Sequence, residues 1–294
     1  MKYALLAIKI IENYFKNNRK TMPERAEIAI MADLIRDKVN GKKCEKIVIL
    51  PTYNKNEFYS SMSLNYIQYK NVKYVDIGLN LLNVFSRGKK IIFDFNNYRF
   101  VSGCGMTGKW SYQASINTKI ILMFEDTNIY YDEVKIGGNF SVCAYPSNEY
   151  NHIFKDVGPD LMTDEVNWEI YYRIIKDTSD MKICDFMMEQ KYMSGIGAYL
   201  RAEILYYSKI CPHRLLSSLS NLDIYNLFYY SKTIIFESYR CNGLTIQDYV
   251  SPDGKMGTYL CKCYGRKSDD NSFQIIIQQT KGDRVIHWCP DVQV

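Results

Sequence analysis

The spacing of apolar residues changes along the 294-residue chain. The apolar side chains Ile28, Met31 and Ile35 recur at helical spacing after Pro23, which predicts a helix that ends near residues 40–41. Beyond it, short β-rich stretches alternate with Gly, Asn and Asp turns, a pattern typical of antiparallel strands. The expected strands are 46–50, 72–79, 82–86, 90–95, 120–124, 128–131 and 139–145.

The second half of the chain has a helical pattern from residue 164 to about residue 239, with Trp168, Tyr171 and Ile174 on one stripe. Strand-like alternation returns at 273–278 and 284–288. These patterns predict an α+β protein in which an N-terminal β-sandwich with flanking helices precedes a helical domain. The expected parts are an N-terminal extension (1–21), the sandwich (22–150, with a joint over 146–159), the helical domain (151–250) and a tail (251–294).

Composition and charge narrow the class of protein. The hydrophobic fraction of 47% is ample for packed cores, so a mainly disordered chain is excluded. The net charge of +5 is mild, so it permits an anionic partner without demonstrating one. No run of about 18 apolar residues occurs, which excludes a membrane span. Residues 1–21 have the pattern of an amphipathic helix and lack a small-residue cleavage site, so they do not resemble a signal peptide.

The nine cysteines are odd in number and scattered, and no Cys-x-x-Cys pair occurs. This spacing does not fit a disulfide framework, and it removes the strongest sequence signal for a structural zinc. We therefore expect a protein of a reducing compartment, nucleus or cytoplasm, that is not secreted.

A glycine-rich turn lies inside the helical domain. Ser194-Gly195-Ile196-Gly197-Ala198-Tyr199 is followed at once by a helical segment. Free backbone N–H groups and the positive end of a helix dipole suit a phosphate at such a place. The alternative is a plain interhelical turn, and the surrounding motifs have to decide between the two.

Three separate stretches together resemble the formamidopyrimidine-DNA glycosylase and endonuclease VIII family of DNA repair enzymes. The first is Met22-Pro23-Glu24, and the second is residues 195–205 with Pro212-His213-Arg214 downstream. The third combines residues 264–267 and 284–290. The resemblance implies a helix-two-turn-helix unit in the helical domain and a β-hairpin finger in the tail. An unrelated protein with chance motifs is the remote alternative, because the order and spacing agree from Met22 to the C-terminus.

The resemblance implies an enzyme that removes oxidised bases from DNA and then cuts the backbone, with an N-terminal proline amine as nucleophile. A secondary amine that attacks the sugar C1′ forms an iminium, which is an electron sink for phosphate elimination. Pro23 matches that proline, and Glu24 beside it can shuttle protons. Proline at a helix start followed by glutamate is by itself also an ordinary helix beginning.

Pro23 has no free amine while Met22 is attached to it. We therefore expect that the functional chain begins at Met22 and loses that methionine, which leaves Pro23 first. The alternatives are a catalytically silent binder of damaged or single-stranded DNA, or an enzyme that uses another amine such as Lys89.

Other residues match the family's motifs one by one. Lys89, in the turn before strand 90–95, matches a hairpin lysine that holds the phosphate beside the damaged nucleotide. Glu27 matches a second acid at the helix start, and Arg284 matches the finger arginine that grips the phosphates beside the lesion. The remaining matches are assigned to DNA binding: Gly195, Gly197 and Tyr199 in the turn, Met106 as a wedge, and Lys255 in a segment that resembles the family's lesion-capping loop.

The chain departs from the family in the finger. Four zinc-binding cysteines are usual there, but only Cys289 remains in this chain, which predicts a zincless hairpin held by strand pairing and packing of Ile276 and Trp288. A rival set of Cys261, Cys263, His287 and Cys289 has poor spacing for zinc. We expect no metal and no other cofactor.

The wedge that replaces a flipped base is also incomplete, because Lys135 and Ile136 stand where the family has Arg and Phe. This predicts a preference for single-stranded or bubble DNA. Ala198 replaces an asparagine that contacts phosphate. The short segment after residue 257 favours the endonuclease VIII branch, with oxidised pyrimidines or hydantoins as substrates. The expected partner is damaged DNA, without a membrane, and the expected state is a monomer.

Overall fold

The computed structural model describes residues 22–50, 58–60, 66–69, 72–134, 137–163, 166–178, 181–245 and 250–294. The extension predicted for residues 1–21 lies outside this part of the chain, as do Lys135 and Ile136 of the predicted wedge.

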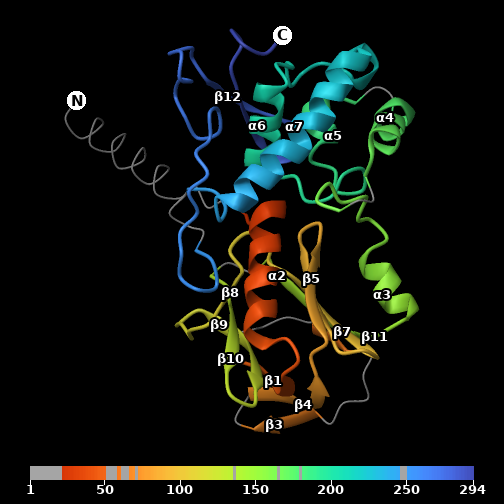
Figure 1. Ribbon diagram of the computed structural model, residues 1–294, viewed down its shortest axis with the longest axis vertical. Helices are drawn as coiled ribbons and strands as arrows, with labels where there is room; N and C mark the ends of the chain where they lie inside the picture. Colours follow the sequence, from red (N-terminus) through yellow and green to blue (C-terminus); the bar gives the residue numbers. More distant parts are fainter. Residues whose placement is uncertain are drawn as a thin grey trace, which may run out of the picture.

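The first helix, α2 (Arg25–Val39), confirms the helical spacing of the sequence. Ile28, Met31 and Ile35 are buried on the face that packs along the sandwich. The backbone N–H of Glu24 donates to the Glu27 carboxylate at 3.0 Å, which satisfies one of the donors that a helix start leaves open. Figure 1 shows α2 running along the sandwich, with its N-terminal end against the helical domain.

The sandwich is built from two sheets. Its strands are β1 (Lys43–Ile49), β2 (Phe58–Ser60), β3 (Tyr66–Tyr69), β4 (Val72–Asn80), β5 (Asn83–Arg87), β6 (Lys90–Asp94), β7 (Tyr98–Gly103), β8 (Lys109–Ser111), β9 (Thr118–Phe124), β10 (Asn128–Asp132) and β11 (Asn139–Ala144). Within the described residues, one sheet has the order β3-β4-β1-β9-β10-β8 and the other the order β2-β11-β7-β6-β5. Neighbouring strands are antiparallel except β2 and β11, which are parallel.

The core lies between the inner faces of the two sheets. Strict alternation along β9 turns Ile120 and Leu122 inward, where they join Phe93 and Phe100 of the other sheet in one apolar cluster. Trp110 lies fully buried in the same cluster, and its indole N–H donates to Ser102 Oγ at 3.2 Å. The predicted β-sandwich is therefore confirmed.

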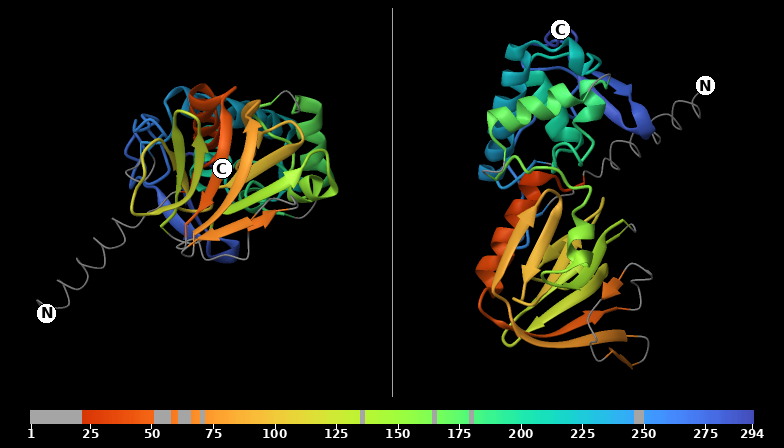
Figure 2. Two further views of the ribbon diagram at one scale, coloured as in Figure 1. Left: turned by 90° about the horizontal axis from the view of Figure 1, so that it is seen from below. Right: turned by 90° about the vertical axis from the view of Figure 1, so that its right-hand side faces the viewer.

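The helical domain packs around its own core. It contains α4 (Trp168–Asp177), the short α5 (Ile183–Phe186), α6 (Ala198–Tyr207), the 3-10 turn η1 (Leu216–Ser218) and α7 (Asn221–Arg240). Its apolar cluster contains Tyr171 and Ile175 of α4 together with Ile204 and Leu205 of α6. The right-hand view of Figure 2 shows this domain stacked on the sandwich, with the N-terminal end of α2 at the boundary.

The expected joint over residues 146–159 carries a helix of its own, α3 (Asn148–Ile153). Tyr150 and Phe154 from this region pack on Ile92 and Val101 of the sandwich. The Ser147 side chain accepts the N–H of Tyr150 at 3.1 Å, which begins the helix.

The finger is a two-stranded ribbon of β12 (Ile276–Gln279) and β13 (Val285–Trp288), with the 3-10 turn η2 (Lys281–Asp283) at its tip. Ile276 pairs with Trp288 in register, so the predicted strand pairing is confirmed. The predicted packing role of Ile276 is wrong, because its side chain is 38% exposed. Ile286 is the fully buried residue that joins the ribbon to the helical core.

All nine cysteines carry free thiols, as their scattered spacing predicts. In the part of the chain that the structure describes, no helix is both long and apolar enough to cross a membrane.

Candidate active site

Glu24 joins the two domains at the N-terminus of α6. Its carboxylate accepts the backbone N–H groups of Gly197 at 2.6 Å, Tyr199 at 2.9 Å and Leu200 at 3.2 Å. The side chain is buried, and an anion is favoured where a helix presents unpaired N–H groups and its positive dipole end. Burial nevertheless dominates and raises the pKa of Glu24 to about 7, while the charge of Lys89 acts in the opposite direction.

Glu27 forms the second acidic centre, one helical turn further along α2. Its carboxylate accepts the hydroxyl of Tyr199 at 3.0 Å, the backbone N–H of Leu244 at 3.0 Å and the N–H of Glu24. Burial raises the pKa of Glu27, and these hydrogen bonds lower it. Glu27 therefore ties the start of α2 to two segments of the helical domain.

The glycine-rich turn differs from the sequence prediction. The N–H of Gly195 donates to Gln190 Oε1 at 2.9 Å, and those of Gly197 and Tyr199 donate to Glu24. The expectation that these three residues offer free N–H groups to a phosphate is wrong, because carboxylate and amide oxygens of the same chain already occupy them. The Tyr199 side chain is buried against Glu27 and faces no open surface.

Ala198 is the exception in that first helical turn. Ala198 is half-buried, and its backbone N–H has no hydrogen-bond acceptor within the described part of the chain. A phosphate that approaches this turn would therefore meet the Ala198 N–H, beside a helix end already charged with the Glu24 carboxylate.

Lys89 lies in the turn between β5 and β6. The turn is closed by Gly88, whose φ of +56° is left-handed and whose missing Cβ would lie 2.9 Å from the Ser194 Cβ. Burial lowers the pKa of Lys89, and the charges of Glu24 and Glu27 act to raise it. The ammonium group therefore lies within electrostatic range of both acids, and it has no hydrogen-bond acceptor among the described residues.

A buried ion pair beside this turn escapes prediction from the sequence. Arg25 Nε donates to Asp160 Oδ1 at 2.7 Å, and the Asp160 Oδ2 atom accepts the N–H of Gly88 at 2.8 Å. The sequence does not reveal this pairing, because 135 residues separate Arg25 from Asp160.

Arg284 directly follows the turn at the tip of the finger; its side chain is exposed, and its guanidinium lies 3.6 Å from a Glu189 carboxylate oxygen. Its charge acts on the pKa of Lys89, so it belongs to the same electrostatic neighbourhood. The next residue, Val285, is held by Arg201, whose NH2 group donates a hydrogen bond to the Val285 carbonyl at 2.6 Å. Arg201 is fully buried and also donates to the Cys184 carbonyl, a second buried group that the sequence pattern does not reveal.

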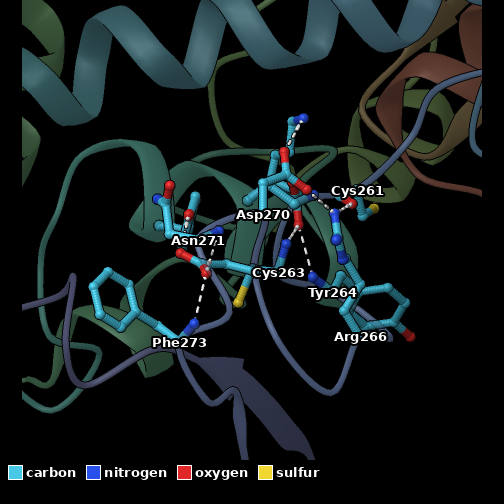
Figure 3. A network of polar contacts seen from close by, with 11 residues as sticks. Cys261, Cys263, Tyr264, Arg266, Asp270, Asn271 and Phe273 are labelled. Carbon is cyan, nitrogen blue, oxygen red and sulfur yellow. Dashed lines mark hydrogen bonds and ion pairs between the residues drawn. The ribbon is translucent and has the colours of Figure 1, made fainter.

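The segment before the finger is held by another buried acid. Glu203 accepts the consecutive backbone N–H groups of Lys262, Cys263 and Tyr264 at 2.7 Å, 2.9 Å and 2.7 Å. Figure 3 shows this network, in which an Asp270 carboxylate oxygen also accepts from Arg266 at 2.7 Å. The approach to the finger is thus fixed by side chains that bind backbone.

The residues present in the finger do not suit the family's zinc. Cys263 and Cys289 are fully buried in an apolar cluster with Ile275, and burial raises the pKa of both thiols, which disfavours the thiolate that zinc requires. Among the described residues no group of three His, Cys, Asp or Glu side chains is placed to hold a metal ion. These residues do not fit a tetrahedral zinc site.

Two predicted DNA-binding residues lie outside this set of contacts. Met106 is 55% exposed in the turn between β7 and β8. Lys255 is exposed and pairs with Asp253 at 2.8 Å, in a turn whose Pro252 carbonyl accepts the N–H of Tyr112 at 3.2 Å. Electrostatic interactions therefore link Lys89 with Glu24, Glu27 and Arg284, and Pro23, which directly precedes Glu24, is buried, whereas Met106 and Lys255 lie on surface turns.

Several known proteins are similar to this chain. Residues 22–138 match the family model described as the formamidopyrimidine-DNA glycosylase N-terminal domain. A formamidopyrimidine-DNA glycosylase of Listeria monocytogenes serovar 1/2a is 27% identical over 288 residues, which cover 92% of this chain and 100% of that protein. One from Bacillus anthracis is 25% identical over 289 residues, with 92% and 99% covered.

Solved structures share the fold. The MutM (Fpg) protein from Thermus thermophilus superposes with a TM-score of 0.81 at 21% identity, over 92% of this chain and 98% of that one. The Lactococcus lactis Fpg in complex with DNA that contains an abasic site gives a TM-score of 0.76 at 20% identity, over 92% and 99%. Residues 22–138 therefore match the N-terminal domain of the formamidopyrimidine-DNA glycosylases, the chain is similar to these enzymes over nearly their whole length, and the solved structures show the same fold.

Proposed function

We propose that the protein is a bifunctional DNA glycosylase and AP lyase that removes oxidised bases. The observation that carries this proposal is the electrostatic pairing of Lys89 with Glu24, the residue that directly follows Pro23, where two domains meet. A carboxyl group with a pKa near 7 exchanges protons readily at neutral pH, which is what base removal and phosphate elimination both require.

The proposed chemistry begins at the Pro23 amine. This amine, freed by loss of Met22, attacks C1′ of the damaged nucleotide, and the bond from C1′ to the base breaks. The sugar ring opens to give an iminium, which draws electrons from C2′ as a proton leaves that carbon. The C3′–O bond then breaks and releases a phosphate end, and water hydrolyses the iminium to return the amine.

Each further residue has a defined part in this proposal. Glu24 carries the proton at the sugar ring, since its carboxylate lies at the α6 N-terminus beside Pro23. Lys89 and Arg284 bind the phosphates next to the lesion, since both are cations without a strong carboxylate partner. Glu27 positions Glu24 through the N–H hydrogen bond between them.

The proposed substrate is an oxidised pyrimidine or hydantoin in single-stranded or bubble DNA. Support comes from the wedge, since Met106 stands exposed on a turn and the Arg and Phe of the family are replaced at 135 and 136. When a base is flipped out of a duplex, an incomplete wedge recovers little of the lost stacking and pairing energy. DNA that is already unpaired avoids this loss, so binding it costs less free energy.

A second candidate is a catalytically silent binder of damaged or single-stranded DNA. It is favoured by the burial of Pro23 and by the Met22 peptide bond, which leaves the proline nitrogen without a free amine. Such a binder would keep Arg284 and the Ala198 N–H without any covalent step.

An incision assay tests the proposal. Protein that begins at Pro23 is incubated with oligonucleotides that contain 5-hydroxyuracil in single-stranded, bubble and duplex form, and also with undamaged strands. We expect incision of the damaged strands, fastest on bubble or single-stranded DNA, and none after Glu24→Gln. Binding without incision in every form would support the silent binder, and faster incision of duplex would refute the strand preference alone.

A further inference from the structure

We propose that Arg25 and Asp160 are positioning residues that hold Lys89 against Glu24, and so set the geometry of the reaction centre across the domain boundary. The inference rests on the proposed function for its catalytic consequence. Its geometric content, the placement of Lys89 by a buried pair, is independent of any activity.

Asp160 holds the Lys89 turn from the side of the helical domain. Its carboxylate is completely buried and accepts three donors: Arg25 Nε at 2.7 Å, the Gly88 N–H at 2.8 Å and the Met162 N–H at 3.0 Å. The Gly88 contact acts directly on the residue that precedes Lys89. Ser194 closes the other side of the turn, because it lies against Gly88 and its N–H donates to the Pro159 carbonyl.

Arg25 holds the same turn from the side of the sandwich. Its NH1 group donates to Ser86 Oγ at 3.0 Å, near the end of β5, and its backbone N–H donates to the Gly195 carbonyl at 3.0 Å. The aliphatic part of the side chain fills the space beside Gly195, where an added Cβ would lie 2.7 Å from the Arg25 Cβ. Because Arg25 directly follows Glu24, one residue fixes both the start of α2 and the turn that bears Lys89.

The placement of this pair argues for positioning more than for stability. Burying two charges costs desolvation energy that the mutual attraction of a pair often fails to recover, so a buried pair is weak evidence of a stabilising role. Here each charged group also binds a backbone or side-chain atom of the element that it locates. A network in which every member is satisfied has one geometry, and loosening it by about an ångström is enough to disturb a reaction centre.

The direct test measures the Lys89 side chain in the DNA-free protein. Lysine amines are labelled by reductive ¹³C-methylation, and the Lys89 signal is assigned by its absence from Lys89→Arg. The variants are Arg25→Met and Asp160→Asn, with Arg36→Met as matched control, because Arg36 forms a partly exposed pair with Asp33 at 2.7 Å on the same helix. Circular dichroism and thermal unfolding establish that each variant is folded.

The expected result is a rise of the Lys89 pKa toward its ordinary value in Arg25→Met, because a released turn returns the amine to water. Asp160→Asn gives a smaller rise, since its amide oxygen still accepts the Gly88 N–H, and Arg36→Met gives none. A folded Arg25→Met protein whose Lys89 titrates as in the wild type would overturn the inference. If Arg25→Met does not fold, the Lys89 titration is compared in Asp160→Asn and in Ser86→Ala, which removes only the hydroxyl that accepts from Arg25 NH1.

The catalytic arm measures AP lyase turnover on DNA that contains an abasic site. Arg25→Met is expected to lower the single-turnover rate by about 10- to 100-fold while DNA affinity changes by less than about threefold. Wild-type protein without lyase activity would contradict the proposed function and leave the titration result standing. A rate loss matched by an equal loss of affinity would contradict the positioning role.

Discussion

The Glu24 carboxylate lies 2.6 Å from the Gly197 nitrogen, across the boundary between the sandwich and the helical domain. The same side chain binds two further N–H groups at the start of α6. Glu24, which follows Pro23, is therefore part of the junction between the domains. Protonation of its carboxylate affects both the proposed proton transfer and the hydrogen bonds that join the domains.

Substitution of Glu24 by glutamine separates these two roles. The introduced amide oxygen still accepts an N–H of α6, so the fold is expected to persist, but a neutral amide cannot shuttle protons. We expect a loss of incision rate of about 100-fold or more with DNA binding retained. Single-turnover kinetics and fluorescence anisotropy check this, with Glu149→Gln on α3 as the control.

The raised pKa of Glu24 makes stability depend on pH. A carboxyl group whose pKa is about 7 in the folded state and 4.5 in the unfolded chain binds more protons when folded, so the protein loses stability as the pH rises between those values. The loss is on the order of 3 kcal/mol in the free energy of unfolding. Urea unfolding at pH 5 and pH 8 measures it.

The Glu24→Gln variant provides the comparison for that measurement, because it has no group to titrate at this position. Its stability is expected to change less than that of the wild type across the same interval. Equal changes in the two proteins would show that Glu24 titrates at an ordinary pKa.

The sequence alone predicts a substantial part of this molecule, for physical reasons. The 3.6-residue spacing of Ile28, Met31 and Ile35 predicts α2, and the β-rich apolar run of residues 120–124 predicts β9. Strand β7 is not predicted, because Phe100, Val101 and Ser102 are buried in succession and no alternation marks it.

The site shows the same division. Pro23, Glu24 and Lys89 can be found from the sequence because they belong to motifs that are local in the chain. The occupation of the Gly197 N–H by Glu24 cannot be predicted, because it depends on how two domains dock across 173 residues of chain. The turn is suited to an anion, as the sequence indicates, but the anion that fills it belongs to the protein itself.

Glu203 is expected to hold the approach to the finger. Alanine at this position removes the carboxylate that accepts the N–H groups of Lys262, Cys263 and Tyr264, and the buried Cys263 donor alone costs about 1–3 kcal/mol when it is left unsatisfied. We expect a marked fall in the unfolding temperature and faster hydrogen exchange at residues 262–264. Glutamine, which keeps one acceptor oxygen, should lose less, and Glu237→Ala on the exposed face of α7 should lose nothing measurable.

Met106 is expected to matter only for paired DNA. Truncation to alanine removes the exposed side chain that would fill the space of a flipped base, so incision of duplex should fall by roughly 10-fold, while incision of single strands stays unchanged. Ile116→Ala, which shortens another exposed apolar side chain, serves as the control. An equal loss on both forms of DNA would show that Met106 acts in some way other than as a wedge.

The Pro23 amine is the nucleophile on which the whole proposed reaction depends. Borohydride trapping on DNA with an abasic site, followed by mass spectrometry of the peptide that carries the adduct, tests it directly. Protein that begins at Pro23 is compared with protein that retains residues 1–22. We predict a reduced adduct on the Pro23 nitrogen of the first protein and none on the second. An adduct that maps to Lys89, or the absence of any adduct from the protein with a free Pro23 amine, would contradict the account.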